Sequence, residues 1–330
     1  MDRSADPRAA GDAAELAVSV VVTVRNEERR LPGLLAALGR QTLPRERFEL
    51  VIVDDASRDG TLALARRHPG ARVVALPAHL GLPAGRNAGI RRARAPVVAL
   101  TDADCIPHDD WLERGVTALA ESGADILAGG ISLPLDSGSP LAAIVDASVY
   151  MNQDAYVRMG FGAGANLWFR RELFERVGFF NELLGMYGDE AELCQRAVAS
   201  GARLLYDRNV AVVHPPRTRF ADVIRKSFMQ GFGLAAHRRF GSGQLHGTDR
   251  LFLCWRSWVP GRRVTGRERL LAQSFVPTTL QLVGMYLAQY ATVRLPLLVG
   301  DLAGEVLHSR TAAALPERAA ADPARGHRIP

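Results

Sequence analysis

Short apolar segments that alternate with helical patterns between residues 18 and 133 constrain the fold of this chain most strongly. Five apolar runs predict strands, at 18–24, 50–53, 72–76, 96–100 and 124–128. Between them apolar residues recur at helical spacing, at 31–38, 57–68, 84–94 and 109–121. Continuous apolar runs are typical of strands buried on both faces of a parallel sheet. The pattern therefore predicts an α/β fold, a doubly wound, mostly parallel sheet flanked by helices.

The chain after residue 133 departs from this alternation. Residues 134–165 contain clusters of Gly, Ser and Pro, which predict a loop or lid beside a site. Helical patterns return at 171–177, 189–200 and 220–240. Residues 1–16 and 311–330 lack apolar periodicity, so we expect disordered tails there.

Composition limits the classes of function. Apolar residues make up 48% and charged residues 23% of the 330 residues, which excludes wholesale disorder. The 41 basic residues exceed the 35 acidic ones, and Lys226 is the single lysine. Two explanations of the arginine excess stay open: the codon bias of a GC-rich genome, and attraction to anionic substrates or an anionic membrane face. The sequence contains no zinc finger and no basic–aromatic stripe, so nucleic acid is not an expected partner.

The cysteines and the N-terminal segment bear on the compartment. Cys105, Cys194 and Cys254 form neither a disulfide framework nor a metal-ligand spacing, which predicts a reducing compartment. The first residues lack the apolar core of a secretory signal. We therefore expect a cytoplasmic protein.

An acidic pair ends the second predicted strand, at the edge where open α/β sheets bind ligands. Asp54 and Asp55 are placed there to accept hydrogen bonds from a nucleobase imide or a ribose hydroxyl. Ser57 and Asp59, which follow, are typical of a helix cap. Capping alone does not account for the first two carboxylates, so we interpret them as ligand-binding residues.

A second acidic pair follows the fourth predicted strand. Asp102 and Asp104 are two residues apart, so in an extended segment both carboxylates face the same side. Hard oxygen ligands suit Mg²⁺ or Mn²⁺, which leave positions open for phosphate oxygens. His214 follows another apolar run, and it is either a structural residue or the ligand that completes this metal site.

Two further segments carry charged side chains beside predicted helices. Arg86 opens a helix and is either a surface arginine or a partner for a diphosphate or a base. Asp189, Glu190 and Glu192 crowd a helix start, where the helix dipole favours negative charge. One of them can also act as a general base, with a pKa that crowding and burial would raise.

Taken in order, these segments resemble family 2 glycosyltransferases with the GT-A fold, over about residues 18–240. The family's motifs are a first strand ending in Asn-Glu at 18–27, the Val-Asp-Asp-x-Ser-x-Asp-Gly-Thr element at 53–61, the Gly-x-x-x-Ala-Arg-Asn-x-Gly element at 81–89, the Asp-x-Asp motif at 102–104 and an acceptor-side segment at 164–178. Three residues depart from the pattern, because Thr23 replaces Pro, Arg25 replaces Tyr and Gly85 replaces Ala.

The resemblance implies that a sugar is moved from a UDP-, GDP- or dTDP-sugar to an acceptor hydroxyl, with inversion, in a single displacement that needs Mn²⁺ or Mg²⁺. It implies that Glu27, Asp55 and Arg86 bind the donor nucleotide. It also implies that Asp102 and Asp104 bind the diphosphate and the metal. The nucleotide preference stays open, because Thr23 and Arg25 stand where the family contacts the base.

The catalytic base implied by the resemblance is an acid of the Gly-Glu-Asp-x-Asp/Glu-Leu motif. The chain has the first two acids exchanged, so matching by position names Glu190. Asp189 stays open as the alternative, because an added methylene displaces the carboxylate and such a displacement affects the rate.

The predicted organisation follows from these assignments. We expect a GT-A domain at 17–216, with a nucleotide-binding half at 17–133 and an acceptor half at 134–216, then a helical extension at 217–310. Two other functions stay open, a nucleotide-sugar-binding pseudoenzyme or scaffold and a sugar-1-phosphate nucleotidyltransferase. The latter needs a Gly-rich N-terminal loop that this chain lacks. Glycan, lipid-linked and small-molecule acceptors all stay open.

The apolar segment at 275–302 bears on location. A membrane-spanning helix needs about 20 predominantly apolar residues, and this segment is interrupted by Thr and Gln. Three alternatives stay open: a spanning helix, a membrane-surface or re-entrant helix, and a soluble core or homodimer interface. We favour peripheral association with the inner face of the cell membrane.

Overall fold

The computed structural model describes residues 15–136, 138–184 and 188–241, together with the single positions 295, 296, 299 and 303. The predicted tails, the apolar segment at 275–302 and most of the predicted extension after residue 241 lie almost wholly outside these ranges. None of the helices within them combines the length and the apolar character that crossing a membrane requires.

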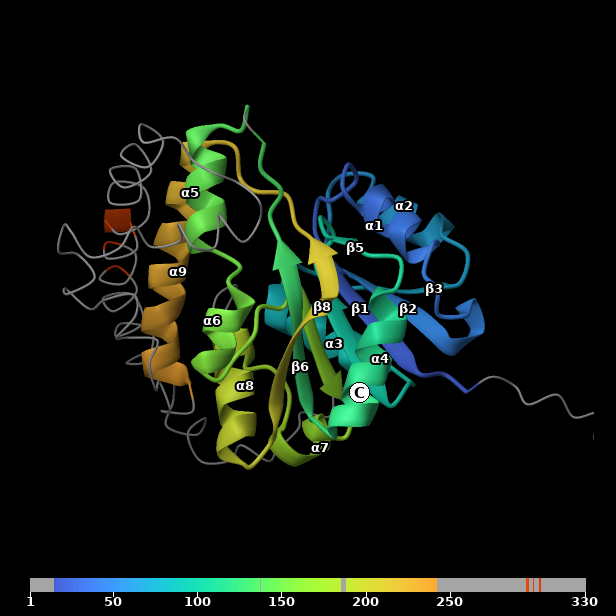
Figure 1. Cartoon of the computed structure of the whole chain (residues 1–330). Coiled ribbons are helices and arrows are strands. Elements are labelled where there is room, and N and C mark those ends of the chain that lie inside the picture. The colour runs from blue at the N-terminus through green and yellow to red at the C-terminus, as the bar shows by residue number, and fades with distance from the viewer. Residues whose placement is uncertain are drawn as a thin grey trace, which may run out of the picture.

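The described residues form one eight-stranded sheet in the order β3-β2-β1-β4-β7-β6-β8-β5 (Figure 1). The strands are β1 (Val18–Val24), β2 (Phe48–Asp54), β3 (Ala71–Ala75), β4 (Val97–Thr101), β5 (Ile106–Pro107), β6 (Ile126–Ser132), β7 (Asn166–Arg170) and β8 (Leu204–Val213). Six strands run parallel, whereas β7 is antiparallel to β4 and β6, and β5 is antiparallel to β8. The predicted α/β class and mostly parallel sheet are confirmed.

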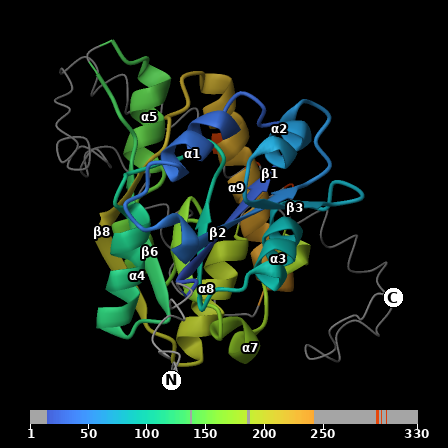
Figure 2. The ribbon, with the colours of Figure 1, turned by 90° about the vertical axis from the view of Figure 1, so that its right-hand side faces the viewer.

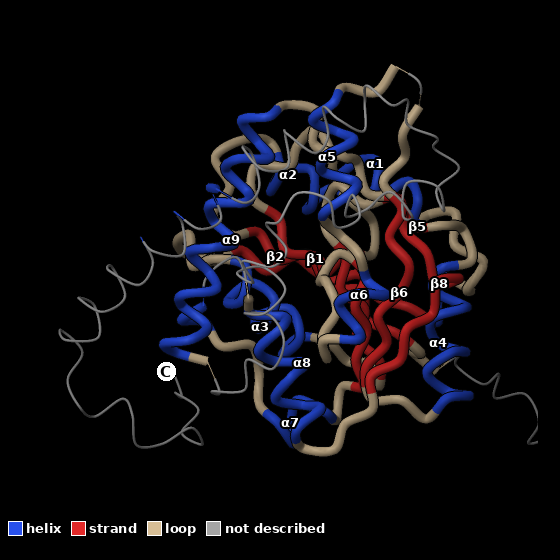
Figure 3. The backbone as a smooth tube through the Cα atoms, turned by 60° about the vertical axis from the view of Figure 1, so that its left-hand side comes forward, coloured by secondary structure: helices blue, strands red, loops and turns tan. Residues whose placement is uncertain are grey.

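The helices cover both faces of this sheet. They are α1 (Leu31–Leu38), α2 (Thr61–Arg67), α3 (Leu82–Arg92), α4 (Trp111–Ser122), α5 (Leu141–Val149), α6 (Gln153–Arg158), α7 (Leu173–Val177), α8 (Asp189–Ala199) and α9 (Phe220–Phe240), with short 3₁₀ turns η1 (Arg45–Arg47) and η2 (Glu182–Leu184). Figure 2 shows α4 and α3 on opposite sides of the sheet, and Figure 3 shows the strands between α4 and the pair α3 and α8.

Two apolar clusters, one on each face, form the core. Side chains alternate along a strand, so Val20 and Val22 of β1 pack toward α1 and α4, whereas Val21 packs toward α3. In β7, Trp168 belongs to the first cluster and Phe169 to the second. Burial on both faces explains why these strands are continuous apolar runs.

The segment predicted as a loop or lid contains two short helices, so the prediction is wrong for 141–149 and 153–158, whereas the other described residues of the segment are irregular. α5 begins after Pro140 and buries seven of its nine residues, and α6 begins after Asn152, whose side chain accepts a hydrogen bond from the Ala155 N–H at 3.2 Å. α5 packs against α9, beside it in Figure 1. The Gly, Ser and Pro residues end and connect these short helices.

The parallel strands bring several chain segments to one edge of the sheet. The carboxyl ends of β1, β2, β4 and β8 and the amino end of the reversed strand β7 lie at this edge. The chain order reverses across β1, since β2 lies on one side of it and β4 on the other. Open α/β sheets bind ligands in the crevice at such a point.

Candidate active site

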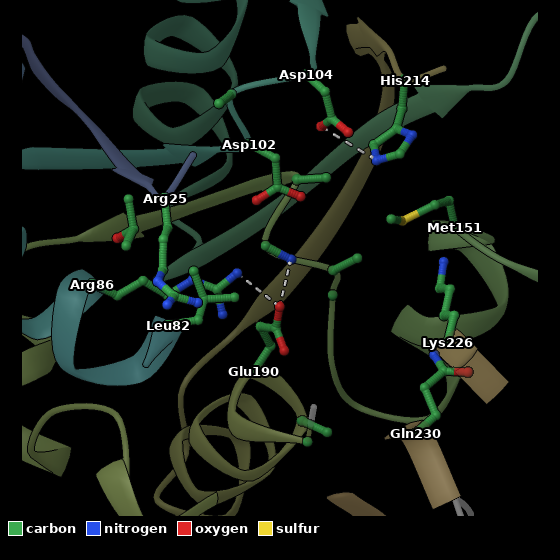
Figure 4. Close-up of a pocket in the computed structure, with 18 of the residues that line it drawn as sticks. Arg25, Leu82, Arg86, Asp102, Asp104, Met151, Glu190, His214, Lys226 and Gln230 are labelled. Atoms are coloured by element: carbon green, nitrogen blue, oxygen red, sulfur yellow. Dashed lines mark hydrogen bonds and ion pairs between the residues drawn. The ribbon is translucent and has the colours of Figure 1, made fainter. Parts of the chain in front are cut away.

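A cavity of about 440 Å³ lies at this edge, and most of the predicted site residues line it. Its walls include Glu27, Asp55, Arg86, Asp102, Asp104, Glu190 and His214. Two predicted residues, Asp54 and Asp189, are buried behind its walls and do not line it. Figure 4 shows the carboxylates of Asp102 and Glu190 near the middle of the site and that of Asp104 beside His214.

Three side chains with metal-ligand atoms meet between β4 and β8. Asp102 and Asp104 follow β4, His214 follows β8, and together with Cys105 their ligand atoms all lie within 4.8 Å of one another. His214 Nε2 is 3.6 Å from Asp104 Oδ1. Burial, then the Asp104 charge, raise the pKa of Asp102.

The cysteine of this cluster already has a hydrogen-bond partner. Burial raises the pKa of Cys105 well above its usual value, and its Sγ donates to the Ala165 carbonyl at 3.7 Å. Mg²⁺ and Mn²⁺ also prefer oxygen ligands to a thiol. The candidate ligands are therefore two carboxylates and one imidazole.

The tautomer of His214 fits a ligand role. Its Nδ1 lies 2.9 Å from the Pro215 carbonyl oxygen, which only accepts hydrogen bonds, so Nδ1 carries the proton. The lone pair is then on Nε2, the nitrogen that faces Asp104. A carbonyl that fixes the tautomer in this way is typical of metal-binding histidines. The three side chains fit a divalent cation.

Arg86 forms ion pairs with Asp189 and Glu190, the two acids that are the alternative candidates for the base. Its guanidinium lies 2.6 Å from Asp189 Oδ2 and 2.9 Å from Glu190 Oε1, and the Gly164 N–H also donates to Glu190 Oε1, at 3.2 Å. Gly164 is required here, because a Cβ at that position would overlap Arg86 Nη2. The side chain of Asp189 is 0% exposed, whereas that of Glu190 is 18% exposed and lines the cavity.

The expected rise in the pKa of the base is found on Asp189 and not on Glu190. Burial and the Glu190 charge raise the pKa of Asp189 well above its usual value. Burial also acts on Glu190, but the Arg86 charge and hydrogen bonds outweigh it and lower that pKa. The expectation is therefore wrong for Glu190, because it did not include a buried arginine.

The first acidic pair divides into two roles. The Asp55 carboxylate accepts from the Leu80 and Gly81 N–H groups at 2.7 and 3.0 Å and lies 2.7 Å from His79 Nδ1, yet it also lines the cavity. Asp54 accepts from the Ser57 N–H at 3.1 Å, so it shapes the turn behind the cavity wall. Sequence reasoning missed His79, which lies in a loop without any motif.

The predicted helix cap is corrected in part. α2 begins at Thr61 after Gly60, and its N-cap residue makes no side-chain capping bond. Asp59 accepts from the Thr61 N–H at 3.0 Å, but the Ser57 hydroxyl accepts from the Asn26 N–H, also at 3.0 Å. Ser57 therefore joins the β1–α1 and β2–α2 loops.

Glu27 and Arg25 extend the cavity wall after β1. Glu27 pairs with Arg30 at 3.1 Å, and burial raises its pKa. Arg25 Nε and Thr23 Oγ1 are buried, and neither has a hydrogen-bond partner within the described residues. Both residues line the cavity, so the positions that depart from the family pattern form part of its wall.

Comparison with known proteins gives the family. The model for glycosyl transferase family 2 matches residues 19–178. Glycosyltransferase AglE of Haloferax volcanii is 31% identical over 222 residues, which are 66% of this chain and 72% of AglE. Pre-mycofactocin glycosyltransferase of Mycobacterium tuberculosis is 26% identical over 237 residues, and the match spans 69% of this chain but only 49% of that protein.

Solved structures agree on the fold. A mannosyltransferase from Pyrobaculum calidifontis, PcManGT in complex with GDP-Man and Mn²⁺, has a TM-score of 0.63 and 24% identity, and the match covers 89% of this chain and 88% of that one. S. aureus TarS 1–349 in complex with UDP has a TM-score of 0.51 and 17% identity, with 90% and 92% covered. At these identities the likeness shows the GT-A fold alone. With the family match and the identity to AglE, it follows that the chain belongs to glycosyltransferase family 2 and is a glycosyltransferase enzyme.

Proposed function

We propose that the chain transfers a sugar from a nucleoside-diphosphate donor to an acceptor hydroxyl, with inversion, in one metal-dependent displacement. One observation carries this proposal: a single cavity contains both the Asp102–Asp104–His214 cluster and the separate Glu190 carboxylate. Only one carboxylate is then used as a base and none as a nucleophile. Direct attack on the anomeric carbon from the face opposite the leaving group inverts that centre.

Glu190 is the base in this proposal. Its Oε1 is held by Arg86 and the Gly164 N–H, which leaves Oε2 to accept the proton of the acceptor hydroxyl. The lowered pKa keeps the carboxylate ionised at neutral pH, as a base must be. Asp189 is fully buried and does not line the cavity, so it acts by positioning Arg86.

The donor occupies the opposite part of the cavity. Asp55, Glu27 and Arg25 lie at the carboxyl ends of β1 and β2, where a base and ribose can be bound. A divalent cation, Mn²⁺ or Mg²⁺, held by Asp102, Asp104 and His214 would offset the charge of the leaving diphosphate. PcManGT was solved with GDP-Man and Mn²⁺ and TarS with UDP, which supports a nucleotide sugar as donor.

Donor binding is the first test. We expect one of the UDP-, GDP- and dTDP-sugars to raise the midpoint of thermal unfolding in the presence of Mn²⁺, since a ligand at 100 times its dissociation constant stabilises a fold by about 2.7 kcal/mol. The shift should disappear in Asp104→Ala. If no nucleotide sugar changes the midpoint of the folded wild-type protein, the donor site is wrongly assigned and a scaffold function is favoured.

Replacing the two acids separately tests the base. We expect Glu190→Gln to bind the donor normally but to lose transfer by roughly 10²–10⁴-fold, the usual contribution of a general base. Asp189→Asn should lose less, because it keeps the Glu190 carboxylate. The measurement is release of the nucleoside diphosphate with a panel of glycan, lipid-linked and small-molecule acceptors. Equal turnover in Glu190→Gln and wild type would exclude Glu190 as the base.

A further inference from the structure

The α9 wall of the cavity presents a cation to which the proposed reaction gives no role. Lys226, the single lysine of the chain, lines the cavity together with Arg217 and Gln230. In Figure 4, Lys226 and Gln230 lie across the site from Arg25 and Arg86, with Glu190 between the two walls. The α9 wall is therefore on the far side of the proposed base from the donor.

Lys226 is buried without a hydrogen-bond acceptor. The residue is 5% exposed, and within the described ranges its Nζ has no hydrogen-bond partner. The ammonium lies 4.0 Å from the centre of the Tyr150 ring. A cation–π contact offsets only part of the cost of removing an ammonium from water. The position is thus unfavourable for stability unless an anion enters the cavity.

The charged side chains around Lys226 that the structure describes do not supply that anion. Asp146 already accepts from the Arg217 backbone N–H at 3.0 Å and from its guanidinium at 3.3 Å. Burial and the Arg217 charge lower the pKa of Lys226 to about 7, against weaker opposing effects of Asp146, Asp102 and Asp104. One helical turn further along, Gln230 Oε1 is also buried without a partner among the described residues. Two polar side chains of α9 that line the cavity thus carry buried atoms without a hydrogen-bond partner among the described residues.

We propose that Lys226 and Arg217 bind an oxyanion of the acceptor, a phosphate or carboxylate near the hydroxyl that receives the sugar. This inference rests on the proposed function, since it takes Glu190 as the base on one side of that hydroxyl. An acceptor that reaches Glu190 from the α9 wall places its anionic group against both cations. Gln230 Oε1 accepts from a neighbouring hydroxyl of the same molecule.

Thermal unfolding gives the first test. Lys226→Met keeps most of the side-chain volume and removes the buried charge, so its unfolding midpoint should be higher than that of the wild type. Arg225→Met removes the same charge from an exposed position next to it on α9 and should leave the midpoint nearly unchanged. A midpoint of Lys226→Met below that of Arg225→Met would mean that the ammonium stabilises the fold, and would overturn the inference.

Binding of small anions gives the second test. Hexyl phosphate, hexanoate and the uncharged hexanol are titrated against wild type, Lys226→Met and Arg225→Met, each with and without a saturating nucleoside diphosphate and Mn²⁺. We expect at least one anion to bind the wild type and the Arg225→Met control, and to bind Lys226→Met at least about tenfold more weakly, because a charge-assisted contact is lost. The affinity for the nucleoside diphosphate should be equal in all three proteins.

The outcomes of these titrations distinguish an anion of the acceptor from an anion of the donor. They also distinguish failure of the acceptor inference from failure of the proposed function. If neither anion binds the wild type better than hexanol does, or if Lys226→Met binds them equally well, the acceptor inference is wrong. If Lys226→Met weakens the nucleoside diphosphate instead, the oxyanion belongs to the donor, which also overturns it. The wild type could bind an anion through Lys226 but bind no nucleotide sugar. That result would contradict the proposed function, but it would leave anion binding by Lys226 and Arg217 standing.

Discussion

Arg86 lowers the pKa of the proposed base, Glu190, although it lies in a different segment of the sequence. The guanidinium is buried between Asp189 and Glu190, and these charges raise its pKa against the effect of burial. It lowers the pKa of Glu190, while Asp189 remains the acid with the raised pKa. A nucleotide contact by Arg86, which the resemblance implies, stays a prediction, since the contacts made here are with these two acids.

Two departures from the family pattern are neighbours in space. A Cβ at position 85 would overlap Thr23 Cγ2 and lie 2.9 Å from its Oγ1. Thr23, which replaces the family's Pro, therefore leaves room only for Gly at position 85, where the family has Ala. The two positions are 62 residues apart in the sequence, and only the packing of α3 on β1 brings them together.

This pairing predicts the outcome of a double-mutant cycle. Gly85→Ala should destabilise the fold by about 1–3 kcal/mol, because the added methyl has no room beside Thr23. Thr23→Ala in the same chain should recover most of that loss, which thermal unfolding measures as a coupling energy. Gly33→Ala is the control, since a Cβ there meets only the Ile106 side chain, at 3.2 Å. Additive effects of the two substitutions would show that the positions are independent.

At the scale of elements, the five predicted strands are those that follow the αβ rhythm, β1, β2, β3, β4 and β6. The strands β5, β7 and β8 lie outside this rhythm and were not predicted. The short apolar run of β7 does not distinguish strand from helix. Its reversed direction depends on pairing with β4 and β6, which are distant in the sequence. The helix predicted at 220–240 agrees with α9. The helices α5 and α6 within the glycine-rich segment were not predicted, because short helices give little periodicity.

Glu49 joins three strands and the loop before β4, and its removal should show a defined pH dependence. It accepts from the Ser19 hydroxyl and the Arg94 N–H, both at 2.7 Å, and pairs with the partly exposed Arg72 and Arg94 guanidinium groups. Burial acts to raise the pKa of Glu49, but these hydrogen bonds outweigh it and lower the pKa below its usual 4.5. The carboxylate therefore stabilises the fold above that pH, and the contribution is lost as the pH falls through the folded-state pKa.

We expect Glu49→Gln to cost about 2 kcal/mol at pH 7, a value reduced for the solvent exposure of both arginines. The difference in unfolding midpoint from the wild type should begin to shrink as the pH falls below about 4.5 and should vanish below the lowered folded-state pKa of Glu49, where both proteins carry a neutral side chain. Glu175→Gln, at an exposed position of α7, is the control. A difference that stays constant from pH 7 to pH 3 would mean that the charge of Glu49 is not responsible.

At the scale of the whole molecule, the candidate metal site connects two parts of one sheet. Asp102 and Asp104 follow β4, and His214 follows β8, with β7 and β6 between these strands. A ligand that bridges them should stabilise the folded sheet as a unit. The chain spans 72% of the length of AglE and 49% of that of the pre-mycofactocin enzyme.

Metal addition tests this connection. Mn²⁺ should raise the unfolding midpoint of the wild type, and EDTA should reverse the shift. His214→Ala should lose most of the shift, because one of the three ligands is removed. His108→Ala, at an exposed position beside β5, should respond like the wild type. Equal shifts in His214→Ala and His108→Ala would place the metal elsewhere or exclude His214 as a ligand.

The sequence by itself determined the fold class and the location of the site, because buried strands and helices have characteristic periods and the ends of parallel strands meet at one edge. Local motifs therefore identified Asp55, Asp102, Asp104 and Glu190 as residues of one cavity. Only the tertiary structure decided which acid lies in the cavity and which is buried behind it, and that Lys226 faces the cavity. Burial and charge pairing depend on side chains from distant segments, and no local pattern of residues records those contacts.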